Sequence, residues 1–493
     1  MRESSREKLW TLLLEAVFKD NVLPLTSHCN LSCQFCSHRQ NPPGVLAYYF
    51  APLPWEQLEE LIPFLDPSRK IIIGESSTRL CEGEPFTHPL FMEILSALRQ
   101  RFPQTPLQIT TNGTYLRADN VKEIAALTRA ESILEFIISL NSASAEHRAG
   151  IMGDNSLDAV KGGLALLREN GIGFHGSVVA LPHLTGWDDL EQTLYFLDRE
   201  GALSTRIFLP GYTSYAQPGL RFPSSLWEEL DDFIMKIREK ITHPLTLEPP
   251  INRDLAARVQ GVFPSSAAYI AGLRTGDLIL SVNGEKVLSG KDAFERLQQA
   301  ADPSVEVLRD GEYTQDIEYI IPKKAGERTG LVFNADLDPH LITEVGKIGK
   351  GYGGSNCGGD GNSSGNGNSS NSSGNGNSKS SGDEVKSVLL LTSFLAAPLW
   401  QAARNSLLLP ENIEISIVEN RFFGGSICCA GLLTIEDFQA HLSEIIPHFS
   451  NTANSPPIVL VPPAPFDRKG FDLLGVHCRE LSERFPEVSF LFL

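Results

Sequence analysis

The chain has 493 residues, 42% of them hydrophobic, and a formal net charge of −18 at pH 7. This length exceeds what a single hydrophobic core usually supports, so we expect several domains. The acidic balance and the absence of any basic run argue against nucleic acid as a partner, because binding to its phosphates needs clustered Lys and Arg.

Residues 1–20 predict an amphipathic helix. Glu15 interrupts their apolar stretch and no small-residue cleavage site follows, which argues against a secretory signal. No apolar run of the sequence is long enough to span a bilayer, so no membrane partner is expected. The cysteines lack the spacing of a disulfide framework, and this favours a reducing, cytoplasmic location.

Residues 21–248 alternate short apolar runs with helical patterns such as WEQLEELIPFL and DDLEQTLYFLDREG. Buried strands between amphipathic helices indicate βα units and a parallel sheet. The α/β pattern predicts a partial (β/α)6 barrel with functional groups at the C-terminal strand ends, although a doubly wound sheet would alternate in the same way. We expect strands at 22–28, 70–76, 107–112, 134–141, 174–182 and 205–211.

The stretch HCNLSCQFCSH directly follows the first expected strand. Cys29, Cys33 and Cys36 form the pattern C-x3-C-x2-C, with Phe35 before the last cysteine. Three thiolates can bind three irons of a [4Fe–4S] cluster and leave the fourth iron open to a small molecule. The alternative is a zinc site completed by a histidine at either end of the stretch.

The cysteine spacing and Phe35 resemble the radical S-adenosylmethionine (radical SAM) superfamily. CEGEPFTHP, after the second expected strand, is similar to the family's Gly-Gly-Glu-Pro motif, with Glu82 in place of the first glycine. The resemblance implies a set of SAM contacts along successive strand ends. These are Gly83, Glu84 and Pro85 for the methionine part, Ser139 and Asn141 for the ribose, and the backbone around Val178 for the adenine.

The resemblance also implies an oxygen-sensitive enzyme. A reduced cluster passes one electron to SAM, whose C–S bond breaks to give a 5′-deoxyadenosyl radical that abstracts hydrogen from a substrate. This chemistry implies a low-potential electron donor of the flavodoxin or ferredoxin type. Cys81 adjoins the expected SAM loop, and we hypothesise that it donates or accepts a hydrogen atom; simple packing is the alternative. His175 either faces the barrel interior as a proton-transfer group or is a hydrogen-bonded core histidine.

Residues 252–338 resemble a bacterial PDZ domain, most specifically in AGLRTGDLILSVNG. The resemblance implies a small β-rich α+β fold that binds a peptide or protein by strand addition. The nearest match to the family's Gly-Leu-Gly-Phe carboxylate loop is GLVF at residues 330–333, at the far end of the domain, so a purely architectural role is equally open. The PDZ module slightly favours a peptide or protein substrate over a small molecule.

Residues 345–385 are rich in Gly, Ser and Asn, contain Cys357 and predict a flexible linker. Residues 386–493 predict a small α/β domain with strands at IEISIVE, SICCAGLL and PIVLVPP. This region resembles the domain of unknown function that accompanies PDZ-containing radical SAM proteins. Its NRFFGG stretch (420–425) either binds an anion, docks on the barrel, or forms a turn with its aromatic side chains in the core.

Two readings without radical chemistry stay open: an iron–sulfur electron-transfer protein and a zinc-stabilised PDZ adaptor. Zinc without sulfide would support the adaptor, whereas four irons and four sulfides would support the cluster.

Overall fold

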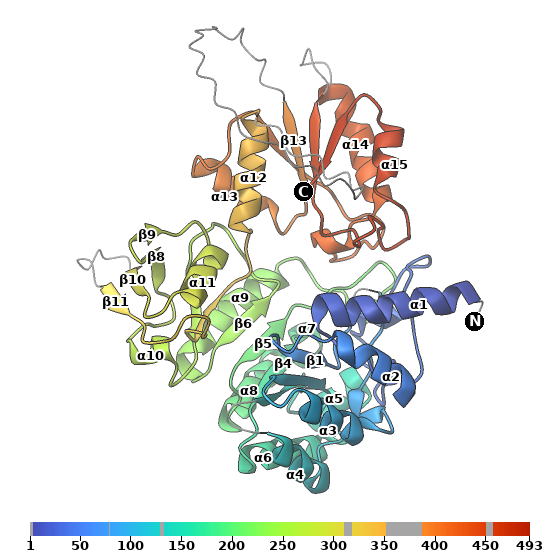
Figure 1. Cartoon of the computed structure of the whole chain (residues 1–493), viewed down its shortest axis with the longest axis vertical. Coiled ribbons are helices and arrows are strands. Elements are labelled where there is room, and N and C mark those ends of the chain that lie inside the picture. The colour runs from blue at the N-terminus through green and yellow to red at the C-terminus, as the bar shows by residue number, and fades with distance from the viewer. Residues whose placement is uncertain (1–2, 78, 129–132, 310–317, 352–386, 450–456) are drawn as a thin grey trace, which may run out of the picture.

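The structure is a computed structural model that describes the chain except for residues 1–2, 78, 129–132, 310–317, 352–386 and 450–456. Figure 1 shows three bodies: the N-terminal barrel domain in blue to green, a small domain in yellow-green at its side, and a C-terminal domain in orange and red above the barrel. No described helix is long and apolar enough to cross a lipid bilayer.

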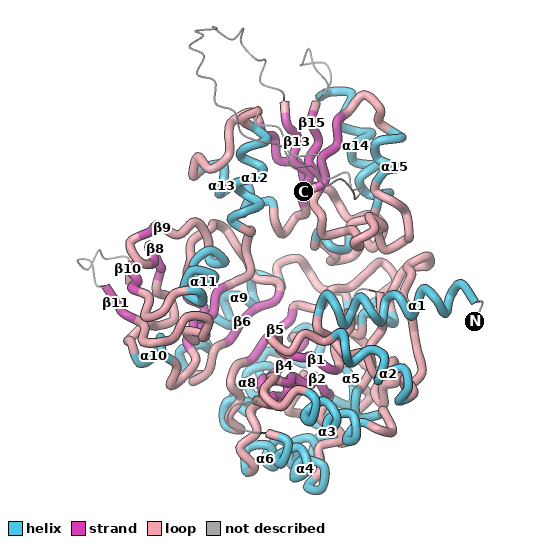
Figure 2. The backbone as a smooth tube through the Cα atoms, in the orientation of Figure 1, coloured by secondary structure: helices cyan, strands magenta, loops and turns pink. Residues whose placement is uncertain are grey.

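A parallel six-stranded sheet with the order β1-β2-β3-β4-β5-β6 forms the centre of the first domain. Its alternation with helices confirms the predicted α/β fold (Figure 2). The strands are β1 (Ile71–Ile73), β2 (Leu107–Thr111), β3 (Leu134–Ser139), β4 (Phe174–Val179), β5 (Thr205–Phe208) and β6 (Leu245–Glu248).

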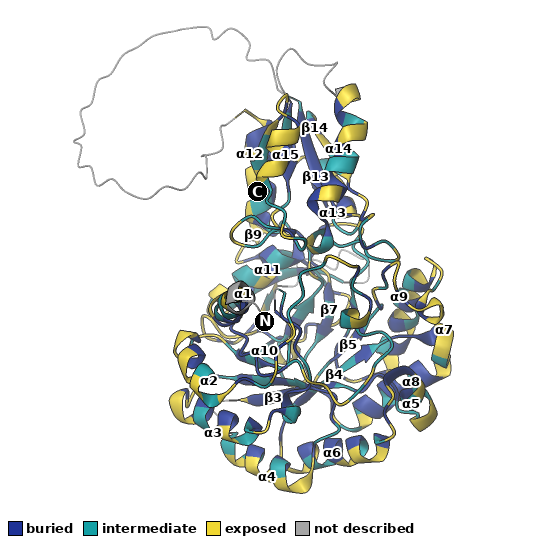
Figure 3. Cartoon of the chain, turned by 90° about the vertical axis from the view of Figure 1, so that its right-hand side faces the viewer, coloured by how far each residue is buried: buried dark blue, intermediate teal, exposed yellow. Residues whose placement is uncertain are grey.

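Helices cover the outer face of this sheet, and their exposed sides point to solvent while the strands are dark with burial (Figure 3). On β3, Leu134, Phe136 and Ile138 are fully buried against the helical layer, and alternate residues face the inside of the curved sheet. The helices are α1 (Glu3–Glu15), α2 (Trp55–Leu61), α3 (Phe91–Arg101), α4 (Ala118–Leu127), α5 (Ala145–Met152), α6 (Leu157–Glu169), α7 (Pro182–Thr185), α8 (Trp187–Arg199) and α9 (Leu226–Ile237).

The strand expected at residues 22–28 is wrong. This segment is extended and makes one β-bridge, between Val22 and Ile72. The Glu82 side chain takes the place of a neighbouring strand, since its Oε1 accepts hydrogen bonds from the backbone N–H groups of Leu25 at 2.9 Å and Thr26 at 3.2 Å. The sequence analysis also missed β6, which contributes only four residues and is flanked by prolines.

The second domain contains two small sheets, β11-β10-β8-β9 and β12-β7. The turn after β8 uses Asn283 and Gly284 with φ angles of 52° and 76°, as a two-residue hairpin requires. The last strand, β12, pairs with the first, β7. Its elements are β7 (Val259–Val262), α10 (Ala267–Ile270), β8 (Leu278–Val282), β9 (Glu285–Lys286), α11 (Gly290–Gln299), β10 (Ser304–Leu308), β11 (Glu318–Ile320) and β12 (Leu331–Phe333).

The C-terminal domain is a parallel sheet with the order β14-β13-β15-β16, covered by helices. The helix α12 packs into its core through Ile342, Val345 and Ile348, so residues 345–349 of the expected linker are helical. Cys357 and the rest of that linker from residue 352 lie outside the described residues. The elements are α12 (Pro339–Gly349), β13 (Val388–Thr392), α13 (Ala397–Asn405), β14 (Ile413–Ile417), α14 (Ile435–Phe449), β15 (Ile458–Val461), α15 (Arg479–Arg484) and β16 (Ser489–Phe492).

The NRFFGG stretch docks the C-terminal domain onto the barrel. The Phe423 carbonyl accepts a hydrogen bond from Ser214 N at 2.8 Å, and Ser426 N donates to the Tyr212 carbonyl at 2.8 Å. Arg421 points elsewhere and pairs with Glu444 on the surface. The expected strand at 426–433 is therefore wrong: its start bonds to the barrel loop after β5 and its end forms a 3-10 turn at 430–432.

Gly425 should be required for this docking. Its φ is 65°, and a Cβ there would lie 2.1 Å from the Tyr212 carbonyl oxygen. A non-glycine residue in this conformation costs on the order of 1–3 kcal/mol before any clash. We expect Gly425→Ala to raise amide hydrogen exchange of residues 211–216 and 423–427 at least about tenfold.

Gly431→Ala is the matched control, because a Cβ at Gly431 meets only the Ala464 carbonyl oxygen at an ordinary 3.6 Å. Equal exchange in both variants would contradict the docking role of this loop.

Candidate functional site

The cysteine loop is held at the C-terminal end of the sheet. Ser32 N donates to the Met152 carbonyl at 3.0 Å and Gln34 N donates to the Ile151 carbonyl at 2.8 Å, which fastens the loop to the end of α5. Phe35 packs in a small apolar cluster beside Met152, and the side chain of Cys33 belongs to the same cluster. The loop conformation is therefore fixed by backbone and apolar contacts.

The three thiols of the loop share one electrostatic environment. Burial, together with the neighbouring Cys29 and Cys36, raises the pKa of Cys33 to about 12. Burial also raises the pKa of Cys29, with Glu84 and Cys36 adding to the effect. None of the three is in a disulfide. Thiolates this close repel each other unless a cationic centre lies between them, which is what an iron–sulfur cluster provides.

As they stand, the described side chains contain no group of three His, Cys, Asp or Glu placed to hold one metal ion. The thiols would have to turn toward a common point to ligate. His38, one of the two histidines considered for zinc, faces other partners: its ring contacts Tyr49 edge-on at 6.0 Å, and its Nε2 lies 3.4 Å from Ser76 Oγ. The loop offers three thiols as donors, and a set of three thiolates suits a cluster with an open iron.

The Gly83–Glu84–Pro85 turn lies directly against the chain that leads into this loop. Gly83 N donates to the Thr26 carbonyl and Glu84 N donates to the His28 carbonyl, both at 2.8 Å. A Cβ at Gly83 would lie 2.0 Å from the His28 carbonyl oxygen, so only glycine allows this approach. The turn and the cysteine loop therefore move as one unit.

Glu84 is a buried carboxyl at the end of β2. Its side chain accepts hydrogen bonds from Thr111 Oγ1 at 2.7 Å and from Asn112 N at 2.8 Å. Burial raises the pKa of Glu84 to about 7, although these hydrogen bonds oppose the shift. The Asn112 side chain continues the chain of contacts and hydrogen-bonds to Cys29. A carboxyl that titrates near neutrality thus adjoins the cysteine loop.

The other residues expected to contact SAM lie at the ends of β3 and β4. Asn141, in the left-handed conformation with φ 59°, accepts a hydrogen bond from Val179 N at 2.8 Å and so ties the two strand ends together. Ser139 faces the inside of the sheet, and its hydroxyl has no hydrogen-bond partner among the described residues. Val178 is fully buried toward the helical layer, so only its backbone is available there.

Two functional groups at this edge escaped the sequence analysis. Arg148, with 0% exposure, donates to Asp154 at 2.5 Å and to the backbone carbonyls of Leu140 and Asn112 at 2.5 and 2.9 Å. Its positive charge also lowers the pKa of Cys33 against the effect of burial. An arginine on a short helix is usually a surface residue. The sequence around Arg148 therefore gives no indication that its side chain is buried.

The second is Glu82, which appears in the sequence as a departure from a motif. Its Oε2 is buried without a hydrogen-bond partner in the described part of the chain. Burial raises the pKa of Glu82 to about 8, and the hydrogen bonds from Leu25 and Thr26 oppose this only partly. Glu82 is thus a protonated carboxyl at neutral pH that replaces a strand partner for the segment before the cysteines.

Cys81 lines a cavity of about 300 Å³ between the barrel and the C-terminal domain. Phe423 and Leu473 of the C-terminal domain form part of its wall. Burial raises the pKa of Cys81, and the nearby Cys36 adds to this rise. The Tyr49 hydroxyl hydrogen-bonds to Cys81 and lowers its pKa. The cavity therefore places Cys81 beside the end of the cysteine loop, where Ser37 and His38 also line it.

Comparison with known proteins identifies two domains. Residues 23–197 match the family model of the Radical SAM superfamily, and residues 258–308 match that of the PDZ domain. The chain contains both domains, as the motifs predicted, and radical SAM proteins bind a [4Fe–4S] cluster and SAM. The resemblance of residues 386–493 to a domain of unknown function stays a prediction.

Similar proteins cover only part of the chain. It is 31% identical over 150 residues to the GTP 3′,8-cyclase of Ectopseudomonas mendocina, which is 30% of this chain and 41% of that protein. It is 32% identical over 183 residues to a GTP 3′,8-cyclase of Mycobacterium sp. (strain KMS), which is 36% of this chain and 48% of that protein. The chain thus spans less than half the length of these curated relatives. Among solved structures, SuiB of Streptococcus suis bound to its precursor peptide SuiA gives a TM-score of 0.35 at 14% identity, over 50% of this chain and 53% of that one.

Glu82→Gln should change how stability depends on pH. The pKa of Glu82 is raised in the folded state from 4.5 to about 8, so its contribution to stability is fully present below pH 4.5 and is lost as the pH rises to 8. Glutamine keeps the acceptor for Leu25 and Thr26 but does not ionise. Between pH 5 and 8 we expect the wild type to lose about 1 kcal/mol per pH unit relative to the variant.

The measurement is the urea midpoint of barrel unfolding, followed by tryptophan fluorescence at several pH values. Glu59→Gln, an exposed site on α2, is the control and should track the wild type. Parallel pH profiles for wild type and Glu82→Gln would contradict a raised pKa.

Proposed function

We propose that this chain, which joins a radical SAM domain to a PDZ domain, is an enzyme that binds a [4Fe–4S] cluster and cleaves SAM reductively to act on a substrate. The observation that carries the proposal is the placement of Cys29, Cys33 and Cys36 on one loop beside Glu84 at the C-terminal edge of the sheet. The three cysteines would hold the cluster, and Phe35 would pack beside it. Functional groups at this edge are the rule for barrel enzymes.

SAM would lie across the neighbouring strand ends. Gly83, Glu84 and Pro85 would contact its methionine part, and the free hydroxyl of Ser139 would bind its ribose. The side chain of Asn141 is already bonded to Val179 N, so we assign it a positioning role in addition to ribose contact. The backbone at Val178 would lie along the adenine.

When bound, the cluster and SAM supply one-electron chemistry that ends in hydrogen-atom abstraction. The protein contributes binding, orientation and exclusion of water. The docked C-terminal domain lies beside the end of the cysteine loop, where its Phe423 and Leu473 line a cavity with His38, and we expect it to limit the access of water to the reacting atoms. Reduction requires an external low-potential donor.

For the substrate class we favour a peptide or protein. The relatives named GTP 3′,8-cyclase match this chain over less than half their length, so their substrate does not transfer. The PDZ domain is a module that binds extended peptides. A nucleotide is the competing substrate class.

The direct test is SAM cleavage. The protein is reconstituted anaerobically with iron and sulfide, reduced with dithionite and given SAM, and 5′-deoxyadenosine is measured by liquid chromatography. We expect production at least about tenfold above a Cys33→Ala blank, because loss of one ligand removes the cluster. Cys478→Ala, in the C-terminal domain, should match the wild type.

Two results would contradict the proposal. A protein that takes up zinc but no iron would support the adaptor reading. An intact cluster whose electron paramagnetic resonance spectrum ignores SAM would support electron transfer.

We also propose that Cys81 donates a hydrogen atom during turnover, because it faces the cavity beside Cys36 and is hydrogen-bonded by Tyr49. The Cys81 S–H bond would break homolytically, leaving a sulfur radical and a new C–H bond on the acceptor. Thiol hydrogen exchanges with solvent, so 5′-deoxyadenosine formed in D₂O without substrate should carry deuterium. We expect Cys81→Ala to lower the deuterated fraction about fivefold or more, as measured by mass spectrometry.

Cys478→Ala again serves as the control. An unchanged deuterated fraction in Cys81→Ala would contradict the hydrogen-donor role and leave Cys81 with a packing role only.

A further inference from the structure

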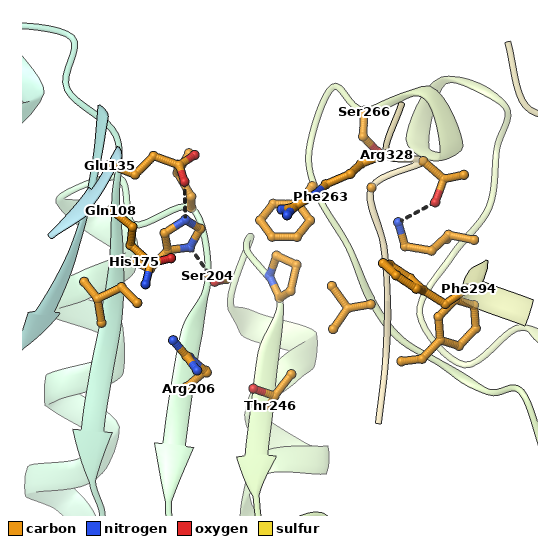
Figure 4. Close-up of a pocket in the computed structure, with 18 of the residues that line it drawn as sticks. Gln108, Glu135, His175, Ser204, Arg206, Thr246, Phe263, Ser266, Phe294 and Arg328 are labelled. Carbon is orange, nitrogen blue, oxygen red and sulfur yellow. Dashed lines mark hydrogen bonds and ion pairs between the residues drawn. The ribbon is translucent and has the colours of Figure 1, made fainter. Parts of the chain in front are cut away.

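A cavity of about 640 Å³ lies between the inner face of the barrel sheet and the PDZ domain (Figure 4). Its barrel wall takes at least one residue from each of the strands β2 to β6. The strand register places Arg206 level with Ser177, two residues beyond His175. The cavity therefore reaches from the beginning of the sheet toward the level of the expected SAM contacts.

Four polar side chains form one row across the inner face of the sheet. The register pairs each of them with the next, and they are Ser139, Ser177, Arg206 and Thr246. Ile138, Val178 and Ile207, their neighbours along the strands, are fully buried toward the helical layer, so the row faces the inside of the barrel. Since Ser139 is the residue expected to bind the ribose of SAM, the row continues from the SAM site across the barrel.

The polar side-chain groups of this row have no hydrogen-bond partner within the described part of the chain. This holds for the three hydroxyl groups and for the guanidinium of Arg206, which makes no ion pair there either. The guanidinium contacts the ring of Phe208, with Cζ 6.0 Å from the ring centre, but this contact leaves its N–H donors unsatisfied. Polar groups inside a protein are normally hydrogen-bonded, so this row offers sites for a polar ligand.

The charged groups nearer the N-terminal strand ends differ, because they are already paired. Lys70 Nζ lies 3.1 Å from Glu135 Oε2, and His175 Nε2 lies 3.7 Å from the same oxygen. The other ring nitrogen of His175 contacts Ser204 Oγ at 2.7 Å. This group is satisfied without a ligand.

Arg206 is exposed to the cavity although its strand β5 has a neighbouring strand on each side. Figure 4 shows Arg206 and Thr246 on neighbouring strands of the barrel wall, farther toward the C-terminal strand ends than His175. A cation without an ion pair, inside a chain whose net charge is −18, indicates that the ligand is an anion.

A carboxyl group near Arg206 limits the charge that this ligand can carry. Glu248 lies on β6 two residues after Thr246, on the same face of the sheet, and lines the cavity. Burial raises the pKa of Glu248, and Arg206 opposes this rise only partly. A phosphate group carries roughly two negative charges and would be repelled by an ionised Glu248. A carboxylate carries one charge and matches the fork of a guanidinium in a bidentate pair.

We propose that a carboxylate group of the substrate binds to Arg206 inside the barrel, with the hydroxyl groups of Ser177 and Thr246 on either side. This inference rests on the proposed function, because it treats the row as the continuation of the SAM site. Neighbouring strands lie roughly 4.8 Å apart, so the backbones at Ser139 and Arg206 are roughly 10 Å apart. The substrate carbon that loses its hydrogen atom would lie between these two residues, within about 10 Å of the carboxylate.

The test follows the guanidinium group itself and needs neither a cluster nor a known substrate. The full-length protein is treated with phenylglyoxal, which modifies accessible arginines, and the rate at each arginine is measured by peptide mass spectrometry. Glutarate is the carboxylate probe, glutaramide is its neutral counterpart, inorganic phosphate is the competing anion, and sodium chloride matches the ionic strength. At about 10 mM we expect glutarate to slow the modification of Arg206 about threefold or more, which corresponds to a Kd of about 5 mM or below.

Arg101 is the matched control, because it is an exposed arginine of the same domain whose guanidinium also lies over a phenylalanine ring, 5.9 Å from the centre of Phe102. Its modification rate should be the same with every probe. Equal slowing at Arg206 by glutaramide, no slowing by glutarate, or stronger slowing by phosphate would overturn the carboxylate assignment. Protection of Arg328 without Arg206 would also overturn it, because the anion would then bind to the PDZ wall of the cavity.

This test and SAM cleavage fail independently. Protection of Arg206 by glutarate in a protein that forms no 5′-deoxyadenosine would retain the carboxylate site and refute the proposed enzyme. Formation of 5′-deoxyadenosine by a protein whose Arg206 is not protected would retain the enzyme and refute the carboxylate site.

Discussion

The buried guanidinium of Arg148 is the interaction on which the C-terminal edge of the barrel depends. A fully buried cation is tolerated only when it is paired and hydrogen-bonded. Asp154 supplies the charge, and backbone carbonyls at the ends of β2 and β3 supply the remaining acceptors. Hydrogen bonds from Ser156 and Arg148 outweigh burial and hold the pKa of Asp154 below its usual value, so the pair stays ionised at neutral pH. Arg148 holds the Asn112 backbone carbonyl, and the Asn112 side chain hydrogen-bonds to Cys29. Arg148 is therefore linked to the cysteine loop through Asn112.

Local sequence patterns predicted the architecture of the chain. Contacts between residues that lie far apart in the sequence could not be predicted from such patterns. Short apolar runs between helical patterns predicted β2, β3 and β4, and the cysteine spacing predicted the radical SAM domain. The burial of Arg148 and Glu82 depends on partners that other elements supply. For Glu82 the partners are backbone N–H groups 56 and 57 residues away. Glu82, which replaces a glycine of the family motif, thus accepts hydrogen bonds from the backbone of the segment that leads to the cysteines.

The two appended domains meet opposite ends of the barrel. The C-terminal domain bonds to the loops that follow the strands, and Arg79 of the barrel reaches the Asp472 carbonyl at 2.5 Å and Asp467 at 3.3 Å. The PDZ domain packs where the strands begin, with Pro244 lying so close to Gly261 that a Cβ there would approach within 2.6 Å. The contact at Gly261 holds two backbones at close range, whereas Arg79 joins its two domains through a charged side chain.

Each of the two docked domains completes a cavity with the barrel. The C-terminal domain contributes Phe423 and Leu473 to a cavity of about 300 Å³ that His38 and Cys81 also line. At the other end of the barrel, the PDZ domain and the sheet enclose a cavity of about 640 Å³ between them. Both cavities need walls from two domains, so neither space would have its present form in the isolated barrel.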